Sequence, residues 1–457
     1  DRAQFAEALR QCGEMERQVR NHPCNVMVTF INEPFPDARP HHGGVRSLLR
    51  EELEDCFIPA AERAVRLQHP DRVIKPVDGD IAPPAPGLPD KHCYTFWYNG
   101  HGLPAGKLYR GYWTPTKPGW HYGCGEFGAE GLDPRELMER HYPAEWLPED
   151  QEDRQWTPNA IVRAQTHRHH FTFYDTPESL DEWIEASRAY QARAVRLQTE
   201  CFRRDPRMVS FALHLFIDAW PAGWMKAVMD CERRPKPAFF AYREALAPLL
   251  LTLRGDRDKF FAGASAGEVE VWLSNDRDVP AENLVLRWQV EDPEGGFVSG
   301  GEGRVGIGAD TAGCVARLAL PVASQVHGRS RRIIRAQVLA DGEDCQSETT
   351  FAYTVYPGVA SAEKVPIGLL ARPGGPARIL AEALGVPTVE VDASDGSEPL
   401  DVLLVDDWEA WQARAVELRP RVEAGLRVVF HGLAPADYDF FGHPVRIEPV
   451  SMNPRIF

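Results

Sequence analysis

The sequence contains no long hydrophobic run, and no stretch approaches the ~18 apolar residues that a transmembrane helix requires. No signal peptide precedes the first predicted helix. Basic residues are also outnumbered: the chain has 51 basic and 67 acidic residues, and its net charge is −16. We therefore expect no membrane span, and neither nucleic acid nor an anionic membrane as a main partner.

Paired cysteines are absent as well. The nine cysteines are scattered singly, none lies in a Cys-x-x-Cys pair, and their number is odd. This spacing predicts reduced thiols instead of a disulfide framework, which slightly favours a cytoplasmic location while leaving the compartment unknown. The sequence also lacks internal repeats and low-complexity tracts. Its 457 residues, 43% hydrophobic and 26% charged, predict a globular chain of two to four domains.

Short apolar strands alternate with helices in residues 1–256. Helices are expected at 2–20, 45–67, 175–204 and 237–251, and strands at 26–31, 72–77, 93–98, 121–128 and 208–217. Strands separated by helices predict a parallel sheet. Since the chain opens on a helix and supplies five strands, we predict strands 4–8 of a (β/α)8 TIM barrel. The N-terminal half of the barrel is then expected from a longer chain or from a second chain.

Two further domains are predicted after the barrel portion. In 257–356, short strands at 269–273, 284–290, 316–320, 334–339 and 349–355 are divided by turns, which predicts an all-β immunoglobulin-like sandwich. In 357–457, strands at 365–370, 388–391, 401–406 and 426–430 alternate with helices at 376–384 and 408–424. This pattern indicates a small doubly wound α/β domain.

Two glutamates lie at the ends of predicted barrel strands. Glu33 follows the strand at 26–31, which Pro34 ends, and Glu126 lies in the strand at 121–128. The C-terminal ends of barrel strands meet at the face where this fold carries its active sites. Two carboxylates facing each other there are what retaining glycoside hydrolysis needs, one to donate a proton and one to attack the anomeric carbon.

Three ordered segments resemble glycoside hydrolase family 2, over roughly residues 1–355. Asn21, His22 and Pro23, followed by Asn32, Glu33 and Pro34, are similar to its acid/base segment, and residues 125–128 (Gly-Glu-Phe-Gly) to its nucleophile segment. A third segment resembles the family's last barrel strand and exit helix. It contains Asp218, Trp220, Pro221, Trp224, Arg234, Pro235, Lys236 and Pro237. This third segment leans toward the mannosidase and exo-glucosaminidase members.

The resemblance implies a role for each carboxylate. Glu33 would be the general acid/base, Glu126 the nucleophile, and Asn32 a partner of the sugar 2-hydroxyl. Glu130 is a rival nucleophile, but only Glu126 has the Phe-Gly context. The resemblance implies a retaining, exo-acting β-glycosidase, β-mannosidase- or β-galactosidase-like. It also likens 357–457 to the class I glutamine amidotransferase fold, which we expect to be non-catalytic here because no cysteine follows Cys345.

Candidate substrate-binding side chains lie on or after the strands. They are Asn32, His92, Tyr94, Trp97, Asp218, Trp220 and Trp224. Aromatic rings can stack on sugars, but packing in the barrel explains several of these residues equally well. Asp218 could bind a hydroxyl or hold a neighbouring arginine.

Other functions remain open at this stage. The chain could be a non-catalytic carbohydrate-binding protein that kept the fold, or a metal-dependent barrel hydrolase. The histidine-rich pieces at 41–42 and 167–170 lack the spacing of a zinc site, so we expect solvated loop histidines, no metal and no cofactor. The expected partner is a carbohydrate substrate, and a homo-oligomer is possible.

Overall fold

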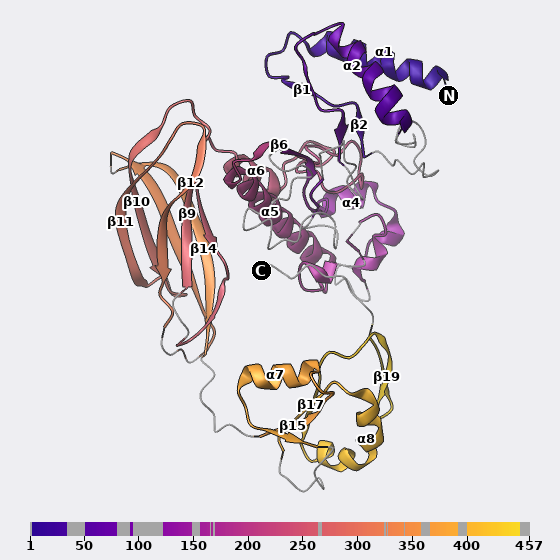
Figure 1. Ribbon diagram of the computed structural model, residues 1–457, viewed down its shortest axis with the longest axis vertical. Coiled ribbons are helices and arrows are strands. Elements are labelled where there is room, and N and C mark those ends of the chain that lie inside the picture. The colour runs from indigo at the N-terminus through magenta and orange to yellow at the C-terminus, as the bar shows by residue number, and fades with distance from the viewer. Residues whose placement is uncertain are drawn as a thin grey trace.

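The computed structural model describes residues 2–33, 51–79, 92–94, 122–148, 156–164, 166–167, 170–263, 267–323, 326, 328–341, 343–357, 366–391 and 400–447. Helices and parallel strand pairs form the N-terminal part, an antiparallel β-sandwich follows, and a small parallel α/β part ends the chain (Figure 1). Among the described helices, none is both long and apolar enough to cross a membrane. All nine cysteines are described, and none of them forms a disulfide.

Parallel strand pairs in the N-terminal part form a partial half-barrel. β1 (Met27–Val28) pairs with β3 (Val73–Ile74), β2 (Ile31–Asn32) with β4 (Val77–Asp78), and β5 (Tyr122–Phe127) with β6 (Met208–Leu213). A parallel bridge joins Cys93 to Phe127. The predicted parallel pairing is confirmed for these segments. Their assignment as strands 4–8 of a complete barrel stays a prediction.

The strand predicted at 26–31 is shorter and less buried than expected. It is broken into β1 and β2, Val26 is 70% exposed, and Ile31 is its only fully buried member. The prediction of burial on both faces is therefore wrong, because Ile31 packs into a core with Phe30 only partly buried against it, and the rest of the run is half-buried or exposed. That core includes Leu53, Phe57 and Val77.

Helices pack beside the strand pairs. They are α1 (Arg2–Val19), the π-helix η2 (Glu52–Phe57), α2 (Ile58–Arg66), α4 (Arg135–His141), α5 (Leu180–Arg204) and α6 (Pro237–Ala245), with 3-10 turns η3 (Ala144–Trp146), η4 (Pro158–Ala160) and η5 (His170–Thr172). Ser179 caps α5 by accepting a hydrogen bond from the Glu182 amide at 3.2 Å. The predicted extension of the last helix to 251 is wrong, since α6 ends at Ala245.

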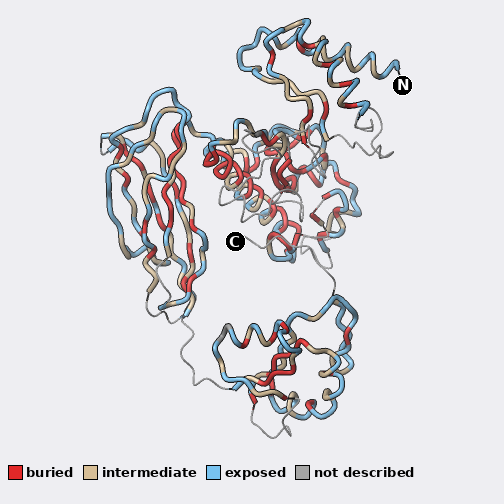
Figure 2. Tube along the Cα trace, viewed as in Figure 1, coloured by how far each residue is buried: buried red, intermediate tan, exposed pale blue. Residues whose placement is uncertain are grey.

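The residues after α6 begin the sandwich. β7 (Leu249–Gly255) pairs with β9 (Gly267–Asn275), which in turn pairs with β12 (Thr311–Leu320). The second sheet has the order β11-β10-β13-β14-β8, with β8 (Lys259–Phe261), β10 (Ala281–Glu291), β11 (Phe297–Ile307), β13 (Ser330–Ala340) and β14 (Asp344–Tyr356). Apolar residues from both sheets share one buried core, visible as the buried stretches of the strands in Figure 2.

The terminal α/β part has a parallel sheet of order β16-β15-β17-β18. Its strands are β15 (Ile367–Leu370), β16 (Thr388–Glu390), β17 (Val402–Val405) and β18 (Arg427–Phe430), with helices α7 (Pro376–Leu384) and α8 (Trp408–Glu423) and a hairpin of β19 (Ala436–Phe440) and β20 (His443–Ile447). The predicted alternation is confirmed. At the carboxyl end of the sheet, the buried Asp406 carboxylate accepts hydrogen bonds from the Arg372 and Ala377 amides, each at 2.8 Å. The glutamine-amidotransferase likeness stays a prediction.

Candidate active site

The two predicted carboxylates meet at the ends of β2 and β5. Glu33 directly follows β2, has a left-handed φ of 47°, and donates its amide to the Asp78 carbonyl at 2.7 Å. Such a backbone is uncommon for a residue other than glycine and often marks a functional position. An oxygen of Glu33, an oxygen of Glu126 and a ring nitrogen of His92 all lie within 4.8 Å of one another. The side chains of Glu33 and Glu126 are 19% and 15% exposed, so a ligand can reach them.

His92 lies between these carboxylates and Asn32. Its Nε2 atom is 2.9 Å from Asn32 Oδ1, 3.3 Å from Glu126 Oε1 and 3.8 Å from Glu33 Oε1. Since all three neighbours are oxygens, Nε2 carries the proton that they share. Gly79 makes this placement possible, because a Cβ there would lie 2.2 Å from Nε2.

The Glu126 carboxylate is stabilised in its ionised form. Burial alone raises its pKa, but the hydrogen bond and charge of His92, the hydrogen bond of Tyr94 and the charge of His214 outweigh burial and lower the pKa to about 2. The Tyr94 hydroxyl donates to Glu126 Oε2. Glu126 is therefore an anion at neutral pH, as a nucleophile must be.

Two further residues that the sequence did not suggest lie beside Glu126. His214 follows the last residue of β6, and its Nε2 is 4.0 Å from Glu126 Oε2. Burial and the Lys226 charge lower the pKa of His214 to about 4, so its ring is neutral at pH 7. The feature of the sequence that could have identified His214 is its position at a strand end, where barrels place their catalytic residues. It was missed because the strand was predicted to continue to 217.

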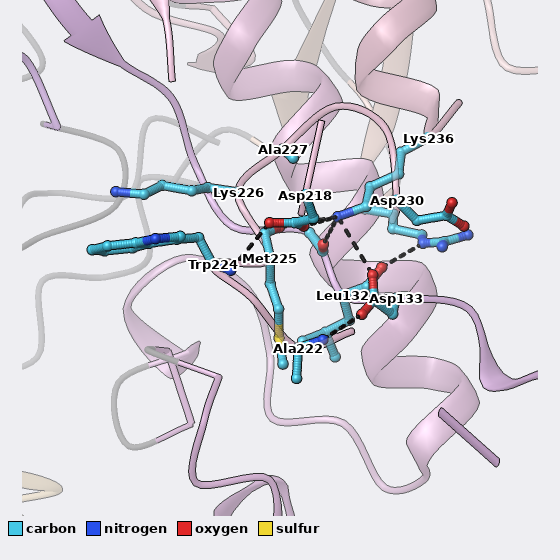
Figure 3. Close-up of polar contacts among 12 residues, drawn as sticks. Leu132, Asp133, Asp218, Ala222, Trp224, Met225, Lys226, Ala227, Asp230 and Lys236 are labelled. Atoms are coloured by element: carbon cyan, nitrogen blue, oxygen red, sulfur yellow. Dashed lines mark hydrogen bonds and ion pairs between the residues drawn. The ribbon is translucent and has the colours of Figure 1, made fainter. Parts of the chain in front are cut away.

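Lys226 brings a positive charge to the same site. Its Nζ lies 4.6 Å from the centre of the Tyr94 ring and 4.4 Å from that of Trp224. Burial lowers the Lys226 pKa to about 8, although nearby carboxylates, led by Glu126 and Glu33, oppose that shift. In Figure 3 the Lys226 side chain and the Trp224 ring extend side by side from one loop. No sequence motif identifies Lys226 as a residue of the site.

The predicted tryptophans differ in their placement. Trp224 is 43% exposed and makes an edge contact with His214, their ring centres being 6.0 Å apart. Trp224 can therefore touch both a ligand and the group beside the nucleophile. Trp220 lies on the same loop and is 56% exposed. Trp97 lies outside the described residues.

Two other carboxylates that the sequence suggested for the site, those of Asp218 and Glu130, are buried. Asp218 is 2% exposed and accepts a hydrogen bond from the Trp224 amide at 3.1 Å, so its carboxylate is buried here and its role in substrate binding stays a prediction. Its charged neighbour is Lys236, at 4.0 Å, and not an arginine. Glu130 is 3% exposed and accepts hydrogen bonds from the amide and hydroxyl of Thr166. This burial favours Glu126 over Glu130 as nucleophile.

Glu33, His92 and Glu126 are also close enough to hold a metal ion. A histidine that binds a metal normally donates its other N–H to an orienting group. Within the described part of the chain, the buried Nδ1 of His92 has no such partner. Of the histidine-rich pieces, His167 and His170 are described, and neither belongs to this group. Residues 41–42 and 168–169 lie outside the described ranges, and His170 is buried, against the expectation of solvated histidines.

The fold of this chain is similar to that of several solved structures. No family model and no curated protein matches the sequence. Among solved structures, a β-D-mannosidase from Dictyoglomus thermophilum matches at a TM-score of 0.53 and 14% identity, over 78% of this chain and 41% of that one. An exo-β-D-glucosaminidase matches at 0.52 and 13%, over 76% of this chain and 38% of that one. The exo-chitosanase of Amycolatopsis orientalis matches at 0.50 and 13%, over 77% and 39%.

These matches establish a likeness of fold. The chain spans about two-fifths of the length of the matched structures. The neighbours' names are those of a mannosidase and of exo-acting glycosidases. The substrate and mechanism are separate questions, which depend on the geometry of the site.

Proposed function

We propose that this chain carries the catalytic pair of a retaining, exo-acting β-glycosidase that removes terminal β-linked sugars. The two sugars that the neighbours' names indicate, a β-mannoside and a β-glucosaminide, are the first substrates to consider. Glu33 is the general acid/base and Glu126 the nucleophile. Asn32, Tyr94 and Trp224 bind the sugar or orient the groups that react with it.

The observation that carries this proposal is the short distance between the two carboxylates. Oxygens of Glu33 and Glu126 lie within 4.8 Å of each other. Retaining glycosidases place their carboxyl groups roughly 5–5.5 Å apart, whereas inverting ones leave roughly 6.5–9.5 Å for a water molecule. The spacing therefore supports direct attack by Glu126 on the anomeric carbon.

The electrostatics support the same division of roles. Glu126 is held as an anion by His92 and Tyr94. In the first step its carboxylate bonds to the anomeric carbon, while Glu33 gives its proton to the leaving oxygen. In the second step Glu33 takes a proton from water, which displaces Glu126 and releases the sugar with its original configuration.

A panel of nitrophenyl β-glycosides tests the proposal on the purified protein. The panel should include an anionic glycoside, since the Lys226 ammonium would attract a negatively charged sugar. We expect release of nitrophenol from at least one substrate, loss of activity in Glu126→Ala, and partial recovery with azide. Glu139→Ala, an exposed glutamate of α4, is the matched control and should keep full activity.

The stereochemistry of the first product provides the decisive readout. Proton NMR should detect the β-anomer before mutarotation, and an α-anomer would contradict the proposal. A carbohydrate-binding protein is the alternative, because the chain covers only part of its structural neighbours. In that case calorimetry would detect saturable sugar binding without any release of nitrophenol.

A further inference from the structure

A buried polar cluster lies beneath the loop that carries Trp224 and Lys226 (Figure 3). Three segments meet there: residues 129–133, which follow β5 and its nucleophile, residues 218–227, which follow β6, and Lys236, which caps α6. The first segment is distant in sequence from the other two. Their contacts therefore determine how the loop sits against Glu126.

Lys236 joins the first two segments directly. Its side chain is 1% exposed, and its Nζ donates to the Gly131 carbonyl at 2.6 Å and to the Met225 carbonyl at 3.1 Å. Met225 lies between Trp224 and Lys226, so this bond fixes the backbone from which both side chains extend. The Gly131 amide also donates to the Met225 carbonyl, at 3.0 Å.

Two aspartates surround the same ammonium. Nζ is 4.0 Å from Asp133 Oδ1 and 4.0 Å from Asp218 Oδ2. Within the described part of the chain these two oxygens accept no hydrogen bond, so the lysine charge is what compensates them. The other oxygen of each aspartate holds the loop: Asp133 accepts from the Ala222 amide at 3.2 Å and Asp218 from the Trp224 amide at 3.1 Å.

We infer that Lys236, together with Asp133 and Asp218, is a positioning residue that sets Trp224 and Lys226 against the nucleophile. The inference rests on the proposed glycosidase function. Lys236 touches no reacting atom. It acts by hydrogen bonds that hold the loop of Trp224 and Lys226 against the segment that follows Glu126. Its loss would remove the nearest positive charge from two buried carboxylates and the donor from the Gly131 carbonyl, and the loop would shift to let water in.

The first test is a double-mutant cycle with the full chain. Lys236→Met keeps the length of the side chain and removes its charge. A loop shift of about 1 Å should lower kcat/KM on the order of 100-fold. In a background that carries Trp224→Ala and Lys226→Met, the same change should cost less than about threefold, because the groups it positions are gone. Lys259→Met, at an exposed lysine of β8, is the matched control.

Equal losses of kcat/KM in both backgrounds would overturn the inference. The effect of a purely structural residue would simply add to the effects of the Trp224 and Lys226 substitutions. Unchanged activity in Lys236→Met would overturn it as well. If Lys236→Met does not fold, the same cycle with Asp218→Asn replaces it. That change removes one charge with little change of shape, and the same two outcomes apply.

Amide hydrogen exchange separates this inference from the proposed function. Peptides covering 222–227 should exchange at least about tenfold faster in Lys236→Met or Asp218→Asn than in the wild type, with no change in Lys259→Met. Unaltered exchange there would refute the positioning role even in an active enzyme. A wild-type protein without glycosidase activity, but with faster exchange in the variants, would refute the function and leave the positioning role intact.

Discussion

Replacing His92 by phenylalanine isolates the group that keeps Glu126 ionised. The phenyl ring occupies a similar volume beside Gly79, but it cannot donate a hydrogen bond to Glu126 or Asn32. Burial raises the Glu126 pKa, and His92 makes the largest opposing contribution. Without His92, only Tyr94 and His214 remain to oppose burial, and the Glu126 pKa rises.

The size of the effect follows from the values for the intact site. The Glu126 pKa is lowered from 4.5 to about 2. That shift of roughly two and a half units corresponds to about 3 kcal/mol in favour of the anion. A carboxylate with a depressed pKa stays ionised until the pH falls through its folded value. We therefore expect Glu126 to stay ionised in the wild type down to about pH 2, and the acidic limb of kcat/KM in the variant to lie at a higher pH.

The assay is the pH profile of kcat/KM from pH 3 to 8 with a dinitrophenyl glycoside. This leaving group needs no proton, so the profile reports Glu126 and not Glu33. Tyr94→Phe, which removes a smaller contribution, should move the acidic limb in the same direction by less. Far-UV circular dichroism at each pH verifies that the proteins remain folded. An acidic limb of His92→Phe that coincides with that of the wild type would refute this account of the site.

Four further changes have distinct expected outcomes. Glu33→Gln should lower kcat/KM by about 10²–10⁴-fold for poor leaving groups and far less for dinitrophenol, as a leaving-group series would show. Lys226→Met should raise the melting temperature while lowering activity, because burial disfavours its ammonium. Trp224→Ala should raise KM by up to about tenfold, measured by steady-state kinetics. Glu16→Gln should destabilise the N-terminal part by about 3–5 kcal/mol in urea titrations, because it breaks a buried pair with Arg72. Hydrogen bonding to Arg72 and His69 outweighs burial and lowers the Glu16 pKa, so the stability that the ionised carboxylate contributes is present above pH 4.5 and is lost as the pH falls through the lower folded value.

Local patterns predicted much of the architecture. The strand–helix alternation of the terminal part follows from short-range rules and is confirmed. The helix predicted at 175–204 is confirmed as α5, except that it begins at Leu180, where Ser179 caps it. Errors arose where tertiary packing overrode those rules. The apolar run at 249–251 continues the helical pattern of α6, but its leucines become a strand because they fill the sandwich core.

The sequence by itself determined that Glu33 and Glu126 end parallel strands, since strand ends can be read from apolar runs and breakers. Only the tertiary structure decided which other groups reach them. His92 and Tyr94 come from one segment, His214 from a strand end and Lys226 from a loop, and no sequence spacing connects these places. Likewise, Asp218 matches a family motif, yet it turns inward to Lys236 because a buried charge requires a buried partner. The lowered pKa of Glu126 depends on distance and burial, which exist only once the chain has folded.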